Sequence, residues 1–340
     1  MKRAGNLIER IAEADNLRLA FWKASKGKRA KAEVICFREN LDVRLRGLRE
    51  ELLSSCVAWG PYHKFMVFDP KERMICAAPF HDRVAHHAIM NIVEPHFEAY
   101  QISDSYACRT GKGLDAALAR ALRFSRPGDW YAKMDVRKYF ASIDHDVLKG
   151  LLQRRFKDPI LLTVLNGIID SYSSSPGRGL PIGNLTSQFF ANHYLGLLDH
   201  HVKQGLYCQR YVRYMDDFVV WDSEKLRLRH TIDQITVSVR RMLHLELKPV
   251  CLNACSRGMT FLGYRIFPSH VRLASRSRKR FCRKLAQYHG NYTTDRWTEE
   301  QTARHVEPLL AFVRRAESDS FRRRAIESIV GSCPKEARTA

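Results

Sequence analysis

The sequence predicts an α+β fold, and three observations indicate it. Residues 128–268 alternate short apolar runs typical of strands with apolar residues at helical spacing. Residues 1–58 and 272–340 show mainly helical spacing. The chain has 340 residues, of which 45% are hydrophobic, so it can bury a large core. We therefore expect two or three compact units, with most strands in the middle of the chain.

The chain is also strongly basic. It contains 57 Lys and Arg residues against 36 Asp and Glu residues, a formal net charge of +21. This charge indicates a polyanionic partner, with nucleic acid ahead of membrane lipid. No apolar run approaches the ~20 residues that span a bilayer, and the first residues carry charges where a secretory signal is apolar. We expect a cytoplasmic protein that does not contact a membrane.

The first 58 residues are predicted to be helical with one basic interruption. Leucines recur at helical spacing from Leu41 to Leu52 and form one apolar face. The interruption, "WKASKGKRAKAEV", is either a solvated loop or a contact for phosphates. Two short strands should follow, joined by the turn Asp69–Glu72, and then a helix over "FHDRVAHHAIMNIVEPHF".

The middle of the chain predicts strands interleaved with helices. The loop "GLPIGNLTSQFFAN" is interpreted as a turn leading into a helix whose N-cap is Thr186 or Ser187. The strand patterns are "DWYAKMDV", "YVRYMDDFVVWD" and "MTFLGYRIF", and the helical patterns are "LLTVLNGIIDSY" and "TSQFFANHYLGLLDHHV".

The tail is predicted to be helical and is very basic where it begins, at "RLASRSRKRFCRKL". Thr298 followed by Gln301 is a capping-box pattern that predicts a helix start. An apolar stripe expected to be core follows at Val306, Leu309, Leu310 and Val313.

Carboxylates occur in two places where an apolar environment does not favour them. Asp135 ends an apolar strand pattern, and Asp216 and Asp217 lie between two apolar strand patterns. Either site alone is explained by structure, since Asp–Asp suits a hairpin turn. A protein that attracts polyanions, however, has no electrostatic reason to place carboxylates on core strands unless they hold cations that bridge to phosphate.

Such carboxylates suit phosphoryl transfer. Two divalent ions held ~3.5 to 4 Å apart activate the attacking oxygen and stabilise the leaving group. Mg²⁺ fits this chemistry because it takes oxygen ligands and keeps positions open for substrate phosphates. The sequence therefore predicts a nucleotidyltransferase.

The ordered motifs resemble those of reverse transcriptases. They span residues 60–268: "KERMICAAPFHDRVAHHAI" resembles the fingers hairpin and its helix, "MDVRKYFASID" the first palm motif, "YMDD" the catalytic box, "LHLELKP" the primer-side Lys motif, and "FLGYRI" the strand leading to the thumb. The resemblance implies a right-hand polymerase, with an antiparallel palm sheet and a short helical thumb. The implied boundaries are an amino-terminal helical extension at 1–58, fingers at 59–127 with interleaving to 190, palm at 128–268 and thumb at 269–340.

The resemblance also implies the catalytic residues. Asp135 and Asp216 would ligate two Mg²⁺ ions, with Mn²⁺ as the alternative, assisted by the Val136 carbonyl and supported by Asp217. The 3′-hydroxyl of a primer would attack the α-phosphate of a deoxynucleotide, and pyrophosphate would leave.

Further positions correspond to nucleotide contacts. Lys71 and Arg73 match cations that meet the incoming triphosphate, or they are ordinary cations of an exposed hairpin. Phe140 matches the residue that excludes a 2′-hydroxyl, or it is palm core like its neighbour Tyr139. Lys248 matches a Lys near the triphosphate, or it is a strand-end charge.

One loop indicates the subgroup. "IGNLTSQ" stands where the family usually has Gln-Gly, three variable residues and Ser-Pro, so Ile182 replaces the Gln and Gln188 the Pro. This combination, the compact size, "SYACRTGKG" and "FHDRVAHHA" resemble the reverse transcriptases of diversity-generating retroelements. That resemblance implies copying of a template-repeat RNA into cDNA with errors at adenines, and a small basic accessory protein that forms a helical-bundle oligomer.

The basic tail is expected to hold template RNA and cDNA primer through phosphates. The candidate phosphate contacts are Arg272, Arg276, Arg278, Lys279, Arg280, Arg283 and Lys284.

The alternatives to a retroelement enzyme are another compact bacterial reverse transcriptase of retron or intron origin, an RNA-dependent RNA polymerase, and an inactive nucleic-acid-binding scaffold.

Overall fold

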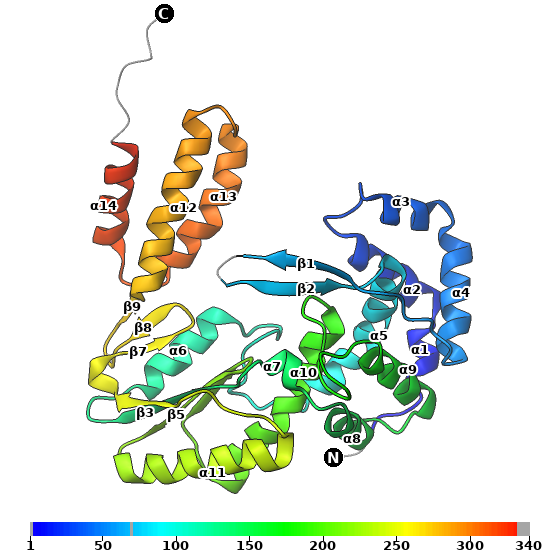
Figure 1. Cartoon of the computed structure of the whole chain (residues 1–340), viewed down its shortest axis with the longest axis horizontal. Coiled ribbons are helices and arrows are strands. Elements are labelled where there is room, and N and C mark those ends of the chain that lie inside the picture. The colour runs from blue at the N-terminus through cyan, green and yellow to red at the C-terminus, as the bar shows by residue number, and fades with distance from the viewer. Residues whose placement is uncertain (1–2, 69–70, 332–340) are drawn as a thin grey trace, which may run out of the picture. The chain divides into compact units, whose positions relative to one another are not determined.

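The structure, a computed structural model, describes residues 3–68 and 71–331 (Figure 1). Helices occupy both ends of this part of the chain, and most strands lie between them. Among the described residues, strands 63–67 and 73–77, 130–135 and 251–254, 259–261 and 264–266, and 264–266 and 271–273 pair antiparallel. The predicted α+β class with antiparallel sheet is therefore confirmed. None of the described helices combines the length and the apolar composition that crossing a membrane requires.

The amino-terminal segment is helical, as predicted. Its apolar face is buried at Leu45, Leu48 and Leu52, whereas Leu41 is half-buried. The basic interruption forms an exposed turn at residues 26–31. The helices are α1 (Ile8–Ile11), α2 (Ala14–Ser25), α3 (Ala32–Glu39) and α4 (Leu41–Leu53), and α2 packs along the long helix α5 (Phe80–Glu98).

A two-stranded hairpin precedes α5, as the sequence predicts. Strands β1 (His63–Val67) and β2 (Arg73–Ala77) pair with Val67 opposite Arg73. Of the predicted turn, Asp69 and Pro70 lie outside the described residues.

The middle of the chain supplies a four-stranded sheet in the order β4-β5-β3-β6. Its strands are β3 (Trp130–Asp135), β4 (Tyr211–Tyr214), β5 (Asp217–Asp222) and β6 (Cys251–Ala254). Four consecutive residues of β5, Phe218 to Trp221, are at most 3% exposed, so this strand is covered on both faces. The helices of this region are α6 (Leu114–Phe124), α7 (Tyr139–Ser142), α8 (His145–Arg155), α9 (Pro159–Asp170), α10 (Leu185–His200) with a following π-helical turn, and α11 (Lys225–Leu243).

Two boundaries differ from the prediction. Helix α10 begins at Leu185 with Asn184 as its N-cap, so Thr186 and Ser187 lie inside the helix and are buried. Asn184 makes no side-chain cap bond because its Oδ1 instead accepts from the Ala78 N–H at 3.3 Å. The predicted strand "MTFLGYRIF" is divided by a turn at Leu262 and Gly263, where both φ angles are positive. It forms β7 (Met259–Phe261) and β8 (Tyr264–Ile266), which form a separate sheet with β9 (Val271–Leu273).

The tail forms α12 (Ser275–Thr293), α13 (Glu299–Arg314) and α14 (Asp319–Val330). The capping box of Thr298 and Gln301 is confirmed. The apolar stripe of α13 is core only at Val313, because Val306, Leu309 and Leu310 are half-buried. The reason is that α13 packs chiefly against one helix, α12, which covers only part of the stripe.

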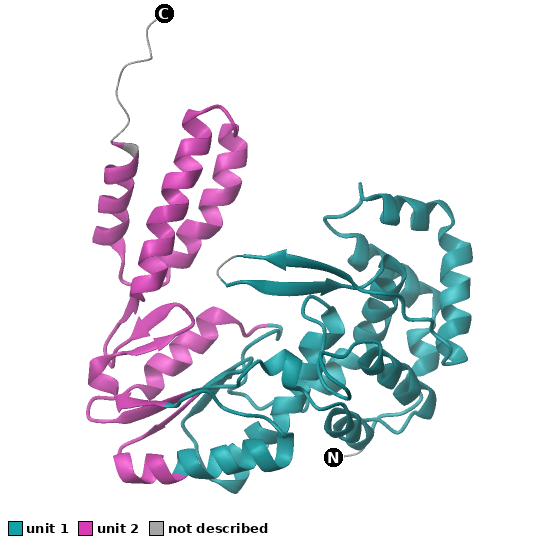
Figure 2. Cartoon of the chain, viewed as in Figure 1, with its two compact units in different colours: residues 1–110, 134–218, 231–250 teal, residues 111–133, 219–230, 251–340 magenta. Residues whose placement is uncertain are grey.

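The chain forms two compact units (Figure 2). The first comprises residues 1–110, 134–218 and 231–250, and the second comprises residues 111–133, 219–230 and 251–340. The predicted carboxylates and Lys248 belong to the first unit, and the basic helix α12 belongs to the second.

Candidate active site

Three carboxylates come together where the central strands begin and end. Asp135 is the last residue of β3, Asp216 lies in the turn between β4 and β5, and Asp217 is the first residue of β5. Burial raises the pKa of Asp216, and the negative charges of Asp135 and Asp217 raise it further. Because β3 and β5 are neighbours in the sheet, the two sequence sites lie close enough for their charges to interact.

Lys248 neutralises part of this cluster. Its Nζ lies 2.6 Å from Asp135 Oδ1, and its backbone N–H donates to the Asp135 carbonyl at 2.8 Å. The charge of Lys248 also opposes the upward shift of the Asp216 pKa. Both partners of the ion pair are partly exposed, so the pair adds little to stability. The structure therefore places the Lys248 ammonium beside Asp135.

Val136 follows Asp135 and is fully buried. It forms an isolated antiparallel bridge with Leu247, made by bonds from Arg137 N–H to the Glu246 carbonyl and from Lys248 N–H to the Asp135 carbonyl. Neither bond uses the Val136 carbonyl. The Val136 carbonyl oxygen therefore takes no part in the bridge between Val136 and Leu247.

The donors of the cluster are all oxygens, which is the set that Mg²⁺ prefers. Within residues 3–68 and 71–331, no group of three or more His, Cys, Asp or Glu side chains that could hold a metal ion is found. Mg²⁺ is commonly bound through one or two carboxylates, with water and substrate phosphates completing the shell. A cation would also relieve the repulsion that raises the pKa of Asp216. The carboxylates thus fit divalent ions whose remaining coordination positions are filled by water or by a nucleotide.

The two aromatic residues after Asp135 have different environments. Tyr139 is 3% exposed, and its hydroxyl donates to the Ala191 carbonyl, so it is core. Phe140 is half-buried, and its carbonyl accepts from the Leu180 N–H at 2.8 Å. Phe140 therefore retains exposed ring surface one residue beyond the buried position.

The loop that carries Ile182 is attached to the hairpin. The Ile182 carbonyl accepts from the Cys76 N–H of β2 at 2.8 Å, and its side chain is half-buried. Gly183, with φ of +120°, lies so close that an added Cβ would meet Ile75 Cγ2 at 2.8 Å. Only glycine fits this backbone comfortably. The position of Ile182 is thus set by a strand about one hundred residues earlier.

Gln188 lies on the first turns of α10, beside a different predicted motif. Its Oε1 accepts from Cys108 Sγ at 3.3 Å. Cys108 belongs to "SYACRTGKG", so the structure joins two motifs that are far apart in the sequence.

Lys71 and Arg73 are exposed on the hairpin. The structure does not join them to the carboxylates.

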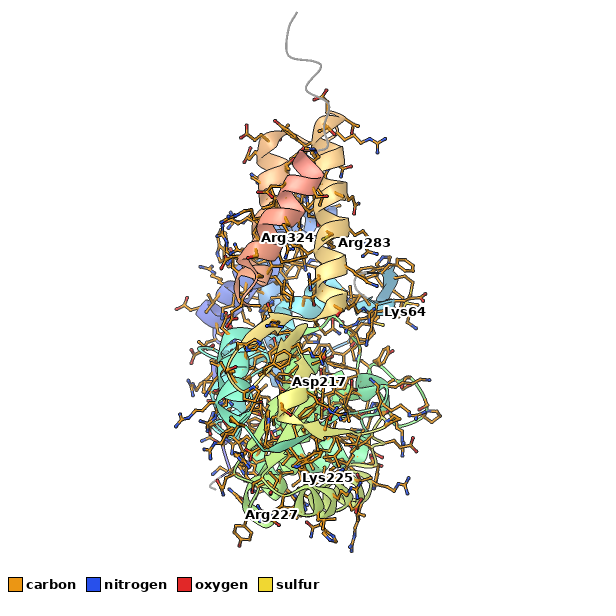
Figure 3. All side chains as sticks on the ribbon, turned by 90° about the vertical axis from the view of Figure 1, so that its left-hand side faces the viewer. Lys64, Asp217, Lys225, Arg227, Arg283 and Arg324 are labelled. Atoms are coloured by element: carbon orange, nitrogen blue, oxygen red, sulfur yellow. The ribbon has the colours of Figure 1, made fainter. Side chains whose placement is uncertain are left out.

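The seven basic tail residues lie on β9 and α12 of the second unit, where Arg280 and Lys284 are half-buried and the other five are exposed. Figure 3 labels Arg283 on α12 and Arg324 on α14.

A buried cation next to the Asp216 turn was not predicted from the sequence. Arg213 of β4 is 0% exposed and donates to the Met215 carbonyl at 3.1 Å. The signal was present, since Arg213 is a charged residue inside the apolar strand pattern "YVRYMDDFVVWD".

Comparison with protein families gives a match over residues 67–266 to the family described as "Reverse transcriptase (RNA-dependent DNA polymerase)". This range includes the carboxylates, Lys248 and the Ile182 loop.

Among curated relatives, Nuclear intron maturase 1 of Arabidopsis thaliana is 36% identical over 27% of this chain and 12% of its own. Protein YkfC of Escherichia coli is 26% identical over 48% of this chain and 46% of its own. Group II intron-encoded protein LtrA of Lactococcus lactis is 26% identical over 39% and 23%. The chain thus aligns with less than half the length of each of these relatives.

Among solved structures, a telomerase from Candida albicans with a fragment of telomeric RNA covers 81% of this chain and 56% of its own, at 12% identity and a TM-score of 0.45. The likeness is remote.

Proposed function

Because the chain belongs to the reverse transcriptase family, we propose that it is an RNA-directed DNA polymerase whose active site is the cluster of Asp135, Asp216 and Asp217. The observation that carries the proposal is the placement of Asp135 at the end of β3 and of Asp216 and Asp217 at the start of the neighbouring strand β5, with Lys248 Nζ 2.6 Å from Asp135. The substrates are an RNA template, a cDNA primer and deoxynucleoside triphosphates.

The reaction joins the primer 3′-oxygen to the α-phosphorus of a deoxynucleotide and breaks the bond to the β-phosphate, releasing pyrophosphate. Asp135, Asp216 and the Val136 carbonyl would hold two Mg²⁺ ions, or Mn²⁺, with Asp217 in support. When bound, such ions activate the hydroxyl and neutralise the developing charge. Lys248 adds a cation at Asp135, and Lys71 and Arg73 would attract the triphosphate.

The parts of the chain take family roles in this proposal. The hairpin and α5 belong to the fingers (59–127), the four-stranded sheet to the palm (128–268), and α12, α13 and α14 to the thumb (269–340). Residues 1–58 form a helical extension. The antiparallel sheet that carries the carboxylates, and the basic helices of the tail, support these assignments.

Primer extension tests the proposal. The full chain is incubated with an RNA template, a DNA primer, deoxynucleotides and Mg²⁺. Product that requires the template, the primer and the metal is the expected result. Retention of nucleic-acid binding without any extension would leave only the inactive scaffold.

The finer proposal is a diversity-generating retroelement enzyme that makes adenine-mutagenised cDNA from a template-repeat RNA. Ile182 and Gln188 in their loop support it. The match to intron-encoded relatives favours a second candidate, a compact bacterial enzyme derived from an intron. Paired variable and template repeats beside the gene would support the first candidate, and an intron or retron RNA gene the second. The first candidate also implies a basic helical-bundle accessory protein. We propose a cytoplasmic location for either candidate.

Replacing Ile182 with Asn should lower misincorporation opposite template adenine. Ile has no hydrogen-bonding group, so a pocket that it lines can enforce pairing only by shape, which discriminates weakly. Sequencing of cDNA from an adenine-rich RNA template measures the error rate. Ile182→Val is the matched apolar control and should keep the errors. Equal error rates in Ile182→Asn and the wild type would contradict this role.

Removing positive charge from the exposed face of α12 should weaken template–primer binding without changing its sequence preference. Arg276→Gln combined with Arg283→Gln is expected to reduce the slope of log affinity against log salt by about one for each phosphate that the protein no longer neutralises. Fluorescence anisotropy at several salt concentrations measures the slope. Arg18→Gln, an exposed change in the first unit, is the control. An unchanged slope would exclude these two residues from the interface.

A further inference from the structure

A fully buried ion pair lies next to the turn that carries Asp216. Arg213 of β4 and Asp199 of α10 have side chains that are each 0% exposed. Arg213 Nε lies 2.7 Å from Asp199 Oδ1, and Arg213 Nη2 lies 2.6 Å from Asp199 Oδ2. This is the bidentate arrangement that a planar guanidinium makes with a carboxylate.

The remaining nitrogen of the guanidinium, Nη1, reaches the catalytic turn. It donates to the Met215 carbonyl at 3.1 Å and to Asn192 Oδ1 at 3.0 Å. The Asn192 amide in turn donates to the Ala107 carbonyl at 2.9 Å. Arg213 thus links the turn to the interior of α10 through side chains that are themselves held in place.

Met215 is the point at which a small movement would displace Asp216. Its φ of +54° is uncommon for a residue other than glycine, so the surrounding structure must maintain it. The Met215 carbonyl belongs to the peptide group that leads into Asp216. A hydrogen bond to this oxygen therefore orients the peptide plane and, with it, the Cα of Asp216.

Stability alone does not account for such a pair. Burying two charges costs desolvation energy that their attraction largely offsets, and an apolar pair of similar volume is often as stable. The geometry differs, however, because an apolar pair cannot hold the Met215 carbonyl.

We propose that Arg213 is a positioning residue that fixes the Met215–Asp216 peptide so that the Asp216 carboxylate meets the divalent ion and the nucleotide. This inference rests on the proposed polymerase function. Asp199 holds the guanidinium in place, so Asp199 acts through Arg213.

Arg213→Lys tests this role because Lys keeps the charge beside Asp199 but lacks the planar fork that reaches several partners at once. We expect kcat for primer extension to fall about 10- to 100-fold, the effect typical of residues that orient a metal ligand. KM for the template–primer should be unchanged, since the nucleic-acid contacts remain. An unchanged kcat in Arg213→Lys would overturn the proposal.

Binding of Mn²⁺ alone, measured by electron paramagnetic resonance, gives a readout that does not depend on turnover. The Arg213→Lys variant should bind Mn²⁺ about 10-fold more weakly than the wild type, because Asp216 is no longer held in position. Equal affinities would contradict the proposal. If the wild type fails to extend a primer, the polymerase function fails, and the Mn²⁺ comparison still decides whether Arg213 positions Asp216.

A double variant separates positioning from folding. Arg213→Met with Asp199→Leu removes both charges together, so no buried charge is left unpaired and a cooperative melting transition should remain. The transition should lie below that of the wild type because the Tyr211 hydroxyl loses its acceptor on Asp199. It should nevertheless lose kcat at least as strongly as Arg213→Lys. Arg227→Lys changes an ion pair between exposed Arg227 of α11 and Asp222, the last residue of β5, and is the matched control with wild-type kcat (Figure 3). A folded double variant with wild-type kcat would refute the positioning role.

Discussion

Asp216→Asn is expected to abolish RNA-templated primer extension, with a loss of about 10³-fold or more in kcat. The substitution preserves the size of the side chain but removes the negative charge that a divalent ion requires. Extension of a labelled primer, followed on a gel over hours, measures the residual rate. Asp233→Asn, an exposed change on α11, should extend like the wild type.

The melting temperature of Asp216→Asn tests whether this variant folds. Burial and two neighbouring carboxylates raise the pKa of Asp216 in the folded protein. Its ionised form is therefore unfavourable in the folded state; this cost is fully present above the raised pKa and disappears as the pH falls to the ordinary pKa of an aspartate. At neutral pH without divalent ions, Asp216→Asn should melt at the same temperature as the wild type or higher. A stable variant with undiminished extension would exclude Asp216 as a metal ligand.

Phe140→Ala is expected to lower the preference for deoxynucleotides over ribonucleotides by about 100-fold. The half-buried ring leaves no room for a 2′-hydroxyl if it packs against the sugar, and the alanine side chain opens that space. Single-nucleotide kcat/KM values for dNTP and NTP measure the ratio.

Tyr139→Phe is the control for this prediction. It removes the hydroxyl that bonds the Ala191 carbonyl but leaves the neighbouring ring in place. Sugar selection should be unchanged in this variant. If Phe140→Ala also leaves the ratio unchanged, Phe140 belongs to the core only. A wild type that already uses ribonucleotides equally well would favour an RNA polymerase.

Local patterns predicted the elements well because they depend on neighbouring residues. The hairpin around residues 63–77, the strand ending at Asp135 and the capping box at Thr298 were all predicted correctly. The predicted start of α10 was wrong because Asn184 bonds Ala78, a partner more than one hundred positions away. The burial of the apolar stripe on α13 was overestimated because helical spacing does not reveal how many neighbouring elements cover a helix.

The sequence by itself determined which chemical groups the protein has available: a basic chain, two carboxylate sites on apolar strands, and ordered motifs that resemble those of reverse transcriptases. Only the tertiary structure decided which residues meet. It placed the Lys248 ammonium beside the Asp135 carboxylate and joined the Ile182 loop to β2 through a backbone hydrogen bond. It also buried Arg213, whose guanidinium donates to the Met215 carbonyl. The physical reason is that residue identity fixes which charges and donors exist, whereas long-range packing and desolvation determine their distances and hence their interaction energies.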